Sequence, residues 1–125
     1  MKLLLDTHVL LWWLDDPLLL SEVAREFIQD SGNEVLVSAA SFWEIAIKRQ
    51  IGKLKAPERI EGALIEIGFT ELPVTISHAM MTERLPMHHR DPFDRLLIAQ
   101  AMVESALIIT RDSAFEAYQH PLVRA

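Results

Sequence analysis

Cysteine is absent from this 125-residue chain, which excludes a disulfide framework, a thiolate metal site and a cysteine nucleophile. Glycine and proline are scarce, with 4 and 6 residues, so long flexible linkers are not expected. No apolar run is long enough to span a bilayer, because Asp6 and His8 interrupt the apolar start of the chain. We therefore expect a cytoplasmic protein with no membrane segment.

Positive charge is also in short supply. The chain has 12 Lys and Arg against 18 Asp and Glu, a formal net charge of -6. This is the wrong sign for sequence-independent nucleic-acid binding, which depends on Lys and Arg that neutralise phosphates. Either the protein does not bind nucleic acid, or it gathers acids around metal ions and relies on a local basic rim. Half of the residues are hydrophobic, which predicts one globular domain over residues 1–125.

Short apolar runs alternate with helical patterns along the chain. Strands are predicted at 2–6, 34–38, 69–74 and 106–110, the third weakened by Pro73. Helices are predicted from about residue 9 to Pro17 and at 22–30, 39–51, 58–67, 77–84, 92–104 and 113–118. Ser21 and Ser38 are expected to cap the helices at 22–30 and 39–51, and Val23 is expected to face inward. This order predicts a three-layer α/β/α domain with a central, mostly parallel sheet of about four to five strands. In such sheets, ligands bind beyond the carboxyl ends of the strands.

Four acidic residues lie near that edge or in the helices beside it. Asp6 ends the first predicted strand, and Asp112 follows the last one by two residues. Asp94 lies in the first turn of the preceding helix, and Glu44 lies within the helix after the second strand. Each also has a structural explanation. Asp6 and Asp94 could cap helices, Asp112 could be a turn residue, and Glu44 could pair with Lys48 at i,i+4 spacing.

Glu44 is the acid that a structural role explains least well. Its helix, 39–51, is apolar on almost every side and is therefore predicted to be largely buried. A buried carboxylate needs a counter-ion, and both Lys48 and a bound metal would meet that need.

If the four acids converge, their charges oppose one another. Two carboxylates about 5 Å apart repel by roughly 3 kcal/mol at an effective dielectric constant near 20. Such repulsion raises their pKa values unless cations lie between them. An all-oxygen cluster selects Mg²⁺ or Mn²⁺, and these ions also bind phosphate oxygens. Phosphodiester hydrolysis is thus the reaction that the pattern favours.

The chain resembles the PIN domain family, and within it the VapC-type toxins of bacterial toxin–antitoxin pairs. The segments that carry the resemblance are Leu3-Leu4-Leu5-Asp6-Thr7-His8, Ser41-Phe42-Trp43-Glu44-Ile45, Asp91-Pro92-Phe93-Asp94-Arg95-Leu96-Leu97-Ile98-Ala99-Gln100-Ala101 and Ile109-Thr110-Arg111-Asp112. One such segment is a weak signal, but four in this order with their acids in place are fairly specific.

The resemblance implies a function as well as a fold. It implies that Asp6, Glu44, Asp94 and Asp112 are the acidic metal-binding and catalytic residues, with Thr110 assisting. It further implies bound Mg²⁺ or Mn²⁺, endonucleolytic cleavage of RNA, a homodimer, and a small antitoxin whose tail covers the acidic groove.

Several neighbouring residues have weaker assignments. Thr7 is a second candidate supporting residue, and Asp91 is interpreted as a helix cap. Arg95 and Arg111 adjoin the acids and could either hold RNA phosphates or balance local charge. His8 could line the site or pack against its helix. The aromatic side chains are interpreted as core or dimer contacts rather than as base-stacking platforms: Trp12, Trp13, Phe42 and Trp43.

Two other functions remain open at this point. A Mg-dependent phosphatase or phosphotransfer domain would use Asp6 as its nucleophile and would need a lysine at a late strand end, where this chain has Arg111. A non-enzymatic acidic interaction module would use the carboxylates only as helix caps, and would leave Glu44 explained by Lys48 alone.

Overall fold

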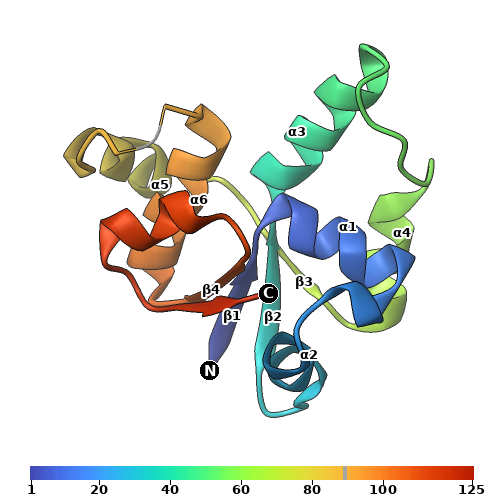
Figure 1. Cartoon of the computed structure of the whole chain (residues 1–125). Coiled ribbons are helices and arrows are strands. Elements are labelled where there is room, and N and C mark those ends of the chain that lie inside the picture. The colour runs from blue at the N-terminus through green and yellow to red at the C-terminus, as the bar shows by residue number, and fades with distance from the viewer. Residues whose placement is uncertain (89) are drawn as a thin grey trace.

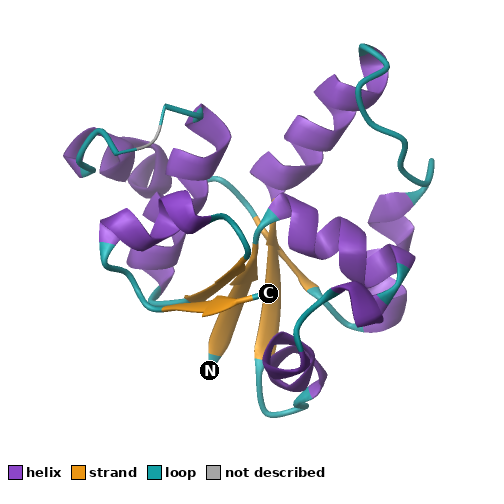
Figure 2. Cartoon of the chain, viewed as in Figure 1, coloured by secondary structure: helices purple, strands orange, loops and turns teal. Residues whose placement is uncertain are grey.

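The computed structural model describes residues 1–88 and 90–125. Its centre is a sheet of five parallel strands in the order β3-β2-β1-β4-β5 (Figure 2). The strands are β1 (Lys2–Leu5), β2 (Glu34–Ser38), β3 (Thr70–Leu72), β4 (Leu107–Thr110) and β5 (Leu122–Arg124). In the register of the sheet, Leu3 of β1 pairs with Val35 on one side and with Leu107 on the other.

Helices cover both faces of this sheet (Figure 1). Towards one face lie α1 (Thr7–Asp15), α2 (Glu22–Gln29), α3 (Ala39–Gln50), α4 (Ile60–Ile67) and the 3₁₀ turn η1 (Pro17–Leu19). Towards the other lie α5 (Ile76–Met81), α6 (Pro92–Glu104) and the 3₁₀ segments η2 (Thr82–Arg84) and η3 (Ser113–Tyr118). The predicted three-layer α/β/α architecture is confirmed. No helix among the described residues is long and apolar enough to cross a membrane.

The alternation of side chains along each strand creates two separate cores. Leu3 and Leu5 of β1 pack towards α1 and α2, whereas Leu4 between them packs towards α6. All three are fully buried, so β1 has no polar face. This is why the strand appears in the sequence as an unbroken apolar run.

Local signals in the sequence set most element boundaries. Ser21, Ser38 and Asp91 accept hydrogen bonds from the first backbone N–H groups of α2, α3 and α6, as predicted for helix caps. Gly68 ends α4 with a left-handed φ of 80°, a conformation that a Cβ atom disfavours.

Three details of the sequence-based fold were wrong. Strand β5 was missed, because it has three residues directly after Pro121 and too little pattern to detect. Val23 was expected to face inward, but it is 53% exposed on α2. Helix α3 buries only one face, and Trp43 is 63% exposed. Helix α3 is therefore half-solvated, although Glu44 lies on its buried face.

The strand order creates a switch point in the middle of the sheet. From β1 the chain continues outward to β2 and β3, and it later returns to β4 and β5 on the opposite side of β1. The carboxyl ends of β1 and β4 therefore lie side by side, with crossovers leaving in opposite directions. Parallel sheets bind ligands at such points.

Ser21 offers a test of this packing, since its hydroxyl accepts from the Ala24 N–H (3.1 Å) and donates to the Arg124 carbonyl (2.8 Å). We expect Ser21→Ala to lower the free energy of unfolding by about 1 kcal/mol, because both α2 and β5 lose a partner. Urea denaturation measures the change. Ser21→Thr, which keeps a hydroxyl, should remain close to the original protein, and equal losses for the two variants would contradict the assignment.

Candidate active site

Asp6 lies at the switch point, directly after β1. Its backbone N–H donates to the carbonyl of Ile109 (3.0 Å), and its Oδ2 accepts a hydrogen bond from the Thr110 hydroxyl (2.9 Å). Only 5% of Asp6 is exposed. Burial raises the pKa of the Asp6 carboxyl, whereas the hydrogen bond from Thr110 acts to lower it. The carboxylate is thus held in one orientation by the end of β4.

Thr110 also connects Asp6 to Asp112. While its hydroxyl donates to Asp6, its Oγ1 accepts from the backbone N–H of Asp112 (3.1 Å). The Asp112 carboxylate accepts from the Ala114 N–H (2.9 Å) and caps η3. Asp112 therefore acts as a capping residue at a turn, which is the structural explanation considered above. It also lies near enough to the other acids for its charge to act on Asp94. Thr110 thus contacts the Asp6 carboxylate and the Asp112 backbone, and its supporting role in a reaction stays a prediction.

Glu44 is the acid of α3 that faces the protein interior, with 4% of its surface exposed. Its Oε2 forms an ion pair of 2.7 Å with Nζ of Lys48, one turn later. The bond to Glu44 is the main cause of a raised pKa for the Lys48 ammonium, and Asp91 and Asp94 add to it. The sequence allowed Lys48 or a bound metal as the counter-ion of Glu44, and the structure shows the pair with Lys48.

Asp94 is the acid on which the charges of the other acidic residues act. Burial is the largest influence on its carboxyl, followed by the charges of Asp6, Asp91, Glu44 and Asp112, and together they raise its pKa to about 8. These influences fall off with distance, so the four predicted acids occupy one region. Asp91 caps α6 by accepting from the Phe93 N–H (2.8 Å), as predicted.

Two contacts hold the helices that carry these acids. The Thr7 hydroxyl, at the start of α1, donates to the Ser41 hydroxyl of α3 (2.9 Å) in the buried interior. The rings of Trp43 and Phe93 meet edge to face, with centroids 5.3 Å apart. Because these two aromatic residues immediately precede Glu44 and Asp94, their contact joins α3 to α6 beside the acids. Thr7 thus links α1 to α3, and its supporting role in the site stays a prediction.

The two arginines next to the acids are engaged elsewhere. Arg95 donates to the carbonyls of Pro86 (2.9 Å) and Thr82 (2.8 Å) and so holds the segment before α6. Arg111 donates to the carbonyls of Ala125 (2.9 Å) and Leu19. Both guanidinium groups have structural contacts, and a role in holding RNA phosphates stays a prediction.

Within residues 1–88 and 90–125, no three His, Asp or Glu side chains are arranged as a ready metal site. The Glu44 carboxylate is paired with Lys48 instead. The donor chemistry nevertheless fits a hard divalent cation, because the converging groups are carboxylates. Burial and, after it, the charges of the neighbouring carboxylates raise the pKa of Asp94, and Mg²⁺ or Mn²⁺ would offset that negative charge.

Comparison with known proteins assigns the chain to a family. The PIN domain model matches residues 3–121. The chain belongs to the PIN domain family. It is 31% identical to Ribonuclease VapC22 of Mycobacterium tuberculosis (strain ATCC 25618 / H37Rv), over 94% of this chain and 92% of that protein. The resemblance to VapC-type proteins is thereby confirmed.

Solved structures share the fold of this PIN domain. VapBC2 from Rickettsia felis, bound to a DNA fragment from its promoter, aligns with a TM-score of 0.73 and 15% identity, covering 99% of this chain and 98% of that one. DNA-bound VapBC from Salmonella typhimurium aligns with a TM-score of 0.72 and 16% identity, over 99% and 98%. At these identities the likeness shows the architecture alone.

Two further residues of this PIN domain act on the acids more directly than their sequence patterns indicated. Lys48 was treated only as a partner of Glu44, yet it also lies in the field of the acids of α6. For His8 the sequence left open a place in the site and packing against its helix, and the structure shows an exposed side chain whose charge lowers the pKa of Asp6. The spacing of His8 from Asp6 was the available signal.

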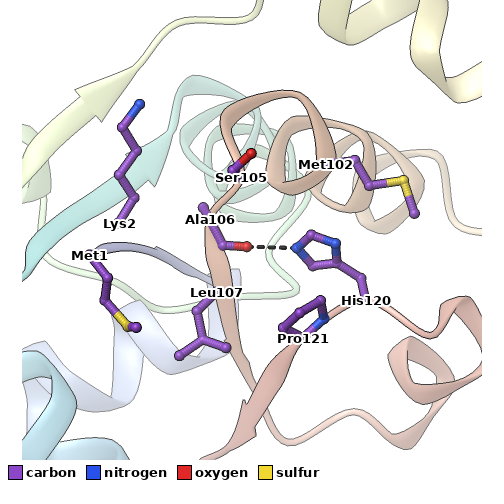
Figure 3. Close-up of a pocket in the computed structure, with 8 residues that line it drawn as sticks. All are labelled: Met1, Lys2, Met102, Ser105, Ala106, Leu107, His120 and Pro121. Carbon is purple, nitrogen blue, oxygen red and sulfur yellow. Dashed lines mark hydrogen bonds between the residues drawn. The ribbon is translucent and has the colours of Figure 1, made fainter.

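A cavity of about 440 Å³ lies at the opposite, amino-terminal edge of the sheet (Figure 3). Its lining residues come from the start of β1, the end of α6 and the strands beyond it: Met1, Lys2, Met102, Ser105, Ala106, Leu107, His120 and Pro121. Nε2 of His120 lies 2.6 Å from the Ala106 carbonyl oxygen. None of these lining residues is acidic, so the cavity is separate from the candidate active site.

Proposed function

We propose that this PIN domain is a Mg²⁺- or Mn²⁺-dependent endoribonuclease that hydrolyses RNA phosphodiester bonds. The observation that carries the proposal is the convergence of carboxylates on Asp94, next to the switch point of a parallel sheet. Such a cluster favours a divalent cation, and a divalent cation favours a phosphate substrate. The relation to a protein named Ribonuclease VapC22 supports RNA as that substrate.

The residues have distinct roles in this proposal. Asp6, Glu44, Asp94 and Asp112 would hold the cation, which supplies positive charge for the phosphoryl oxygens and lowers the pKa of water. Thr110 keeps the Asp6 carboxylate in a fixed orientation through its 2.9 Å hydrogen bond. This matters because a mobile carboxylate would have to be ordered before each reaction.

Lys48 stabilises the same site from the side of α3. Its ammonium balances the charge of Glu44, so α3 can bury a carboxylate beside the acids of α6. A cation held by Glu44 would share this carboxylate with Lys48, whose side chain is already partly exposed to solvent.

We further propose that the protein acts as the toxin of a toxin–antitoxin pair and forms a homodimer. The similar solved structures carry the names of VapBC and FitAB complexes, which supports an antitoxin partner. The exposed apolar side chains of Ile65, Ile76 and Met80 are available for protein contacts.

A metal panel tests the proposed activity. Purified protein is incubated with tRNA, mRNA and rRNA in EDTA, Ca²⁺, Mg²⁺ or Mn²⁺, and the products are separated on denaturing gels. We expect internal cleavage with Mg²⁺ or Mn²⁺ and none in EDTA. Cleavage that persists in EDTA would contradict the role of the acids. Failure to cut any RNA, or a phosphoryl group trapped on Asp6, would contradict the nuclease assignment.

A further inference from the structure

A second hollow of this protein lies beside the acidic site rather than opposite it. A cleft of about 400 Å³ separates the outer side of α1 from the segment that follows α3. Its lining combines aromatic, aliphatic and charged side chains: His8, Leu11, Trp12, Leu14, Asp15, Leu54, Lys55, Ala56 and Pro57. This is more space than one nucleobase occupies.

His8 connects the cleft to the candidate active site. It lines the cleft, its side chain is exposed, and it is two residues from Asp6 in the first turn of α1. Its proximity to Asp6 is also evident from the effect of its charge on that carboxyl. A molecule in contact with the His8 ring would therefore extend directly from the acidic site.

The cleft presents flat rings to such a molecule. The rings of His8 and Trp12 lie with their centroids 5.9 Å apart and their planes inclined by 39°. The Arg111 guanidinium lies 4.2 Å from the centre of the Trp12 ring and holds it in place. Aromatic rings of this kind are surfaces on which unstacked bases of single-stranded RNA bind.

The other wall of the cleft belongs to the most basic part of the chain. Residues 48–59 contain five of the 12 Lys and Arg and a single acid, in a protein of net charge -6. The segment has a defined shape, because Arg49 donates to the Pro57 carbonyl (2.6 Å) and the Lys53 N–H donates to the Lys48 carbonyl (2.8 Å). It supplies the local basic rim that a nuclease of negative net charge requires.

We propose that this cleft binds a nucleotide of single-stranded RNA that flanks the scissile phosphate, with its base against His8 and Trp12 and its phosphate at Lys55. The inference rests on the proposed ribonuclease function and adds a substrate subsite to it. Asp15, the acidic residue of the lining, is an acceptor for an exocyclic amino group of the base. The combination of rings, a lysine and an adjacent acidic site matches a nucleotide better than an acidic peptide, because a nucleotide has a flat base that can stack on the rings.

Steady-state kinetics test the subsite with a fluorescent single-stranded RNA that the unmodified protein cleaves. We expect His8→Ala and Lys55→Gln each to raise KM by about tenfold, because each variant loses a contact to the flanking nucleotide. Lys55→Gln should also leave kcat within about twofold, because Lys55 does not touch the reacting phosphate. His8→Phe should restore KM, since stacking needs the ring and not its charge. Lys2→Gln removes the same charge at the opposite edge of the sheet and should change neither constant.

Photocrosslinking locates the base directly. RNA that carries 5-iodouridine beside the cleavage position is irradiated with the Asp6→Asn variant, and peptides are identified by mass spectrometry. Crosslinks to His8 or Trp12 are the expected result. An unchanged KM in His8→Ala and Lys55→Gln, or crosslinks only outside the cleft, would overturn the subsite while leaving the ribonuclease in place. If the unmodified protein cleaves no RNA, the proposed function itself fails.

Discussion

Asp6→Asn is expected to reduce metal-dependent RNA cleavage by at least about a hundredfold while the protein stays folded. The substitution removes a negative charge from the switch point and keeps the shape of the side chain. An asparagine carbonyl can still accept the hydrogen bond that Thr110 now donates to Oδ2 over 2.9 Å. Since Asp6 is buried, the loss of its charge also relieves a desolvation cost, so the fold should not suffer.

Cleavage rates at saturating Mg²⁺, together with circular dichroism of each variant, measure this effect. Asp30→Asn is the matched control. Asp30 follows α2 and its Oδ1 accepts from the Gly32 N–H (2.8 Å), a bond that asparagine preserves. The control therefore changes the net charge identically without touching the acidic cluster, and it should retain full activity. If Asp6→Asn cleaves RNA at the rate of the original protein, Asp6 does not belong to the active site.

Asp94→Asn is expected to stabilise the metal-free protein at pH 8. The folded state holds a proton on Asp94 up to a pKa of about 8, whereas the unfolded chain releases it near the ordinary value of 3.8. The stability that this proton contributes is present in full below pH 3.8 and is lost as the pH rises towards 8. Asparagine stays neutral at every pH, so the Asp94→Asn variant does not lose this stability as the pH rises. With a discount for the solvent that reaches a half-buried carboxyl, the gain is on the order of 2 kcal/mol.

Thermal unfolding in EDTA near pH 5 and pH 8 measures this difference. The stability of the original protein should fall between the two pH values, and Asp94→Asn should fall less. An unchanged difference between the two proteins at the two pH values would show that Asp94 ionises normally. Asp30→Asn again serves as the control for a change in net charge.

Millimolar Mg²⁺ should reverse the order of the two proteins. A cation that binds only the folded state raises the Tm of the original protein, because binding shifts the unfolding equilibrium. Asp94→Asn lacks one ligand and some of the charge that attracts the ion, so its Tm should respond less. Equal Tm shifts for the two proteins would place the cation elsewhere. Mg²⁺ should also bind more tightly as the pH rises, since it competes with the proton on Asp94.

The sequence by itself determined whatever depends on neighbouring residues. Ser21, Ser38 and Asp91 begin helices because a short polar side chain satisfies nearby backbone N–H groups. An unbroken apolar run identified β1, since both faces of the strand are covered. Asp6 and Asp112 could be selected because ligands bind at the strand ends of a parallel sheet, and Glu44 could be selected because its helix is otherwise apolar. Strand β5 escaped detection because three residues carry too little pattern.

Only the tertiary structure decided which of these parts meet. The order β3-β2-β1-β4-β5 brings Thr110 within 2.9 Å of Asp6 across 104 residues, and no local pattern specifies such a pairing. The same holds for Arg95 and Arg111, whose engagement with carbonyl groups depends on segments that pack against them. Caps and strand ends are local, whereas charges act through space between all elements that the fold brings together. The convergence on Asp94, and the cleft that His8 shares with Lys55, therefore became visible only in the folded chain.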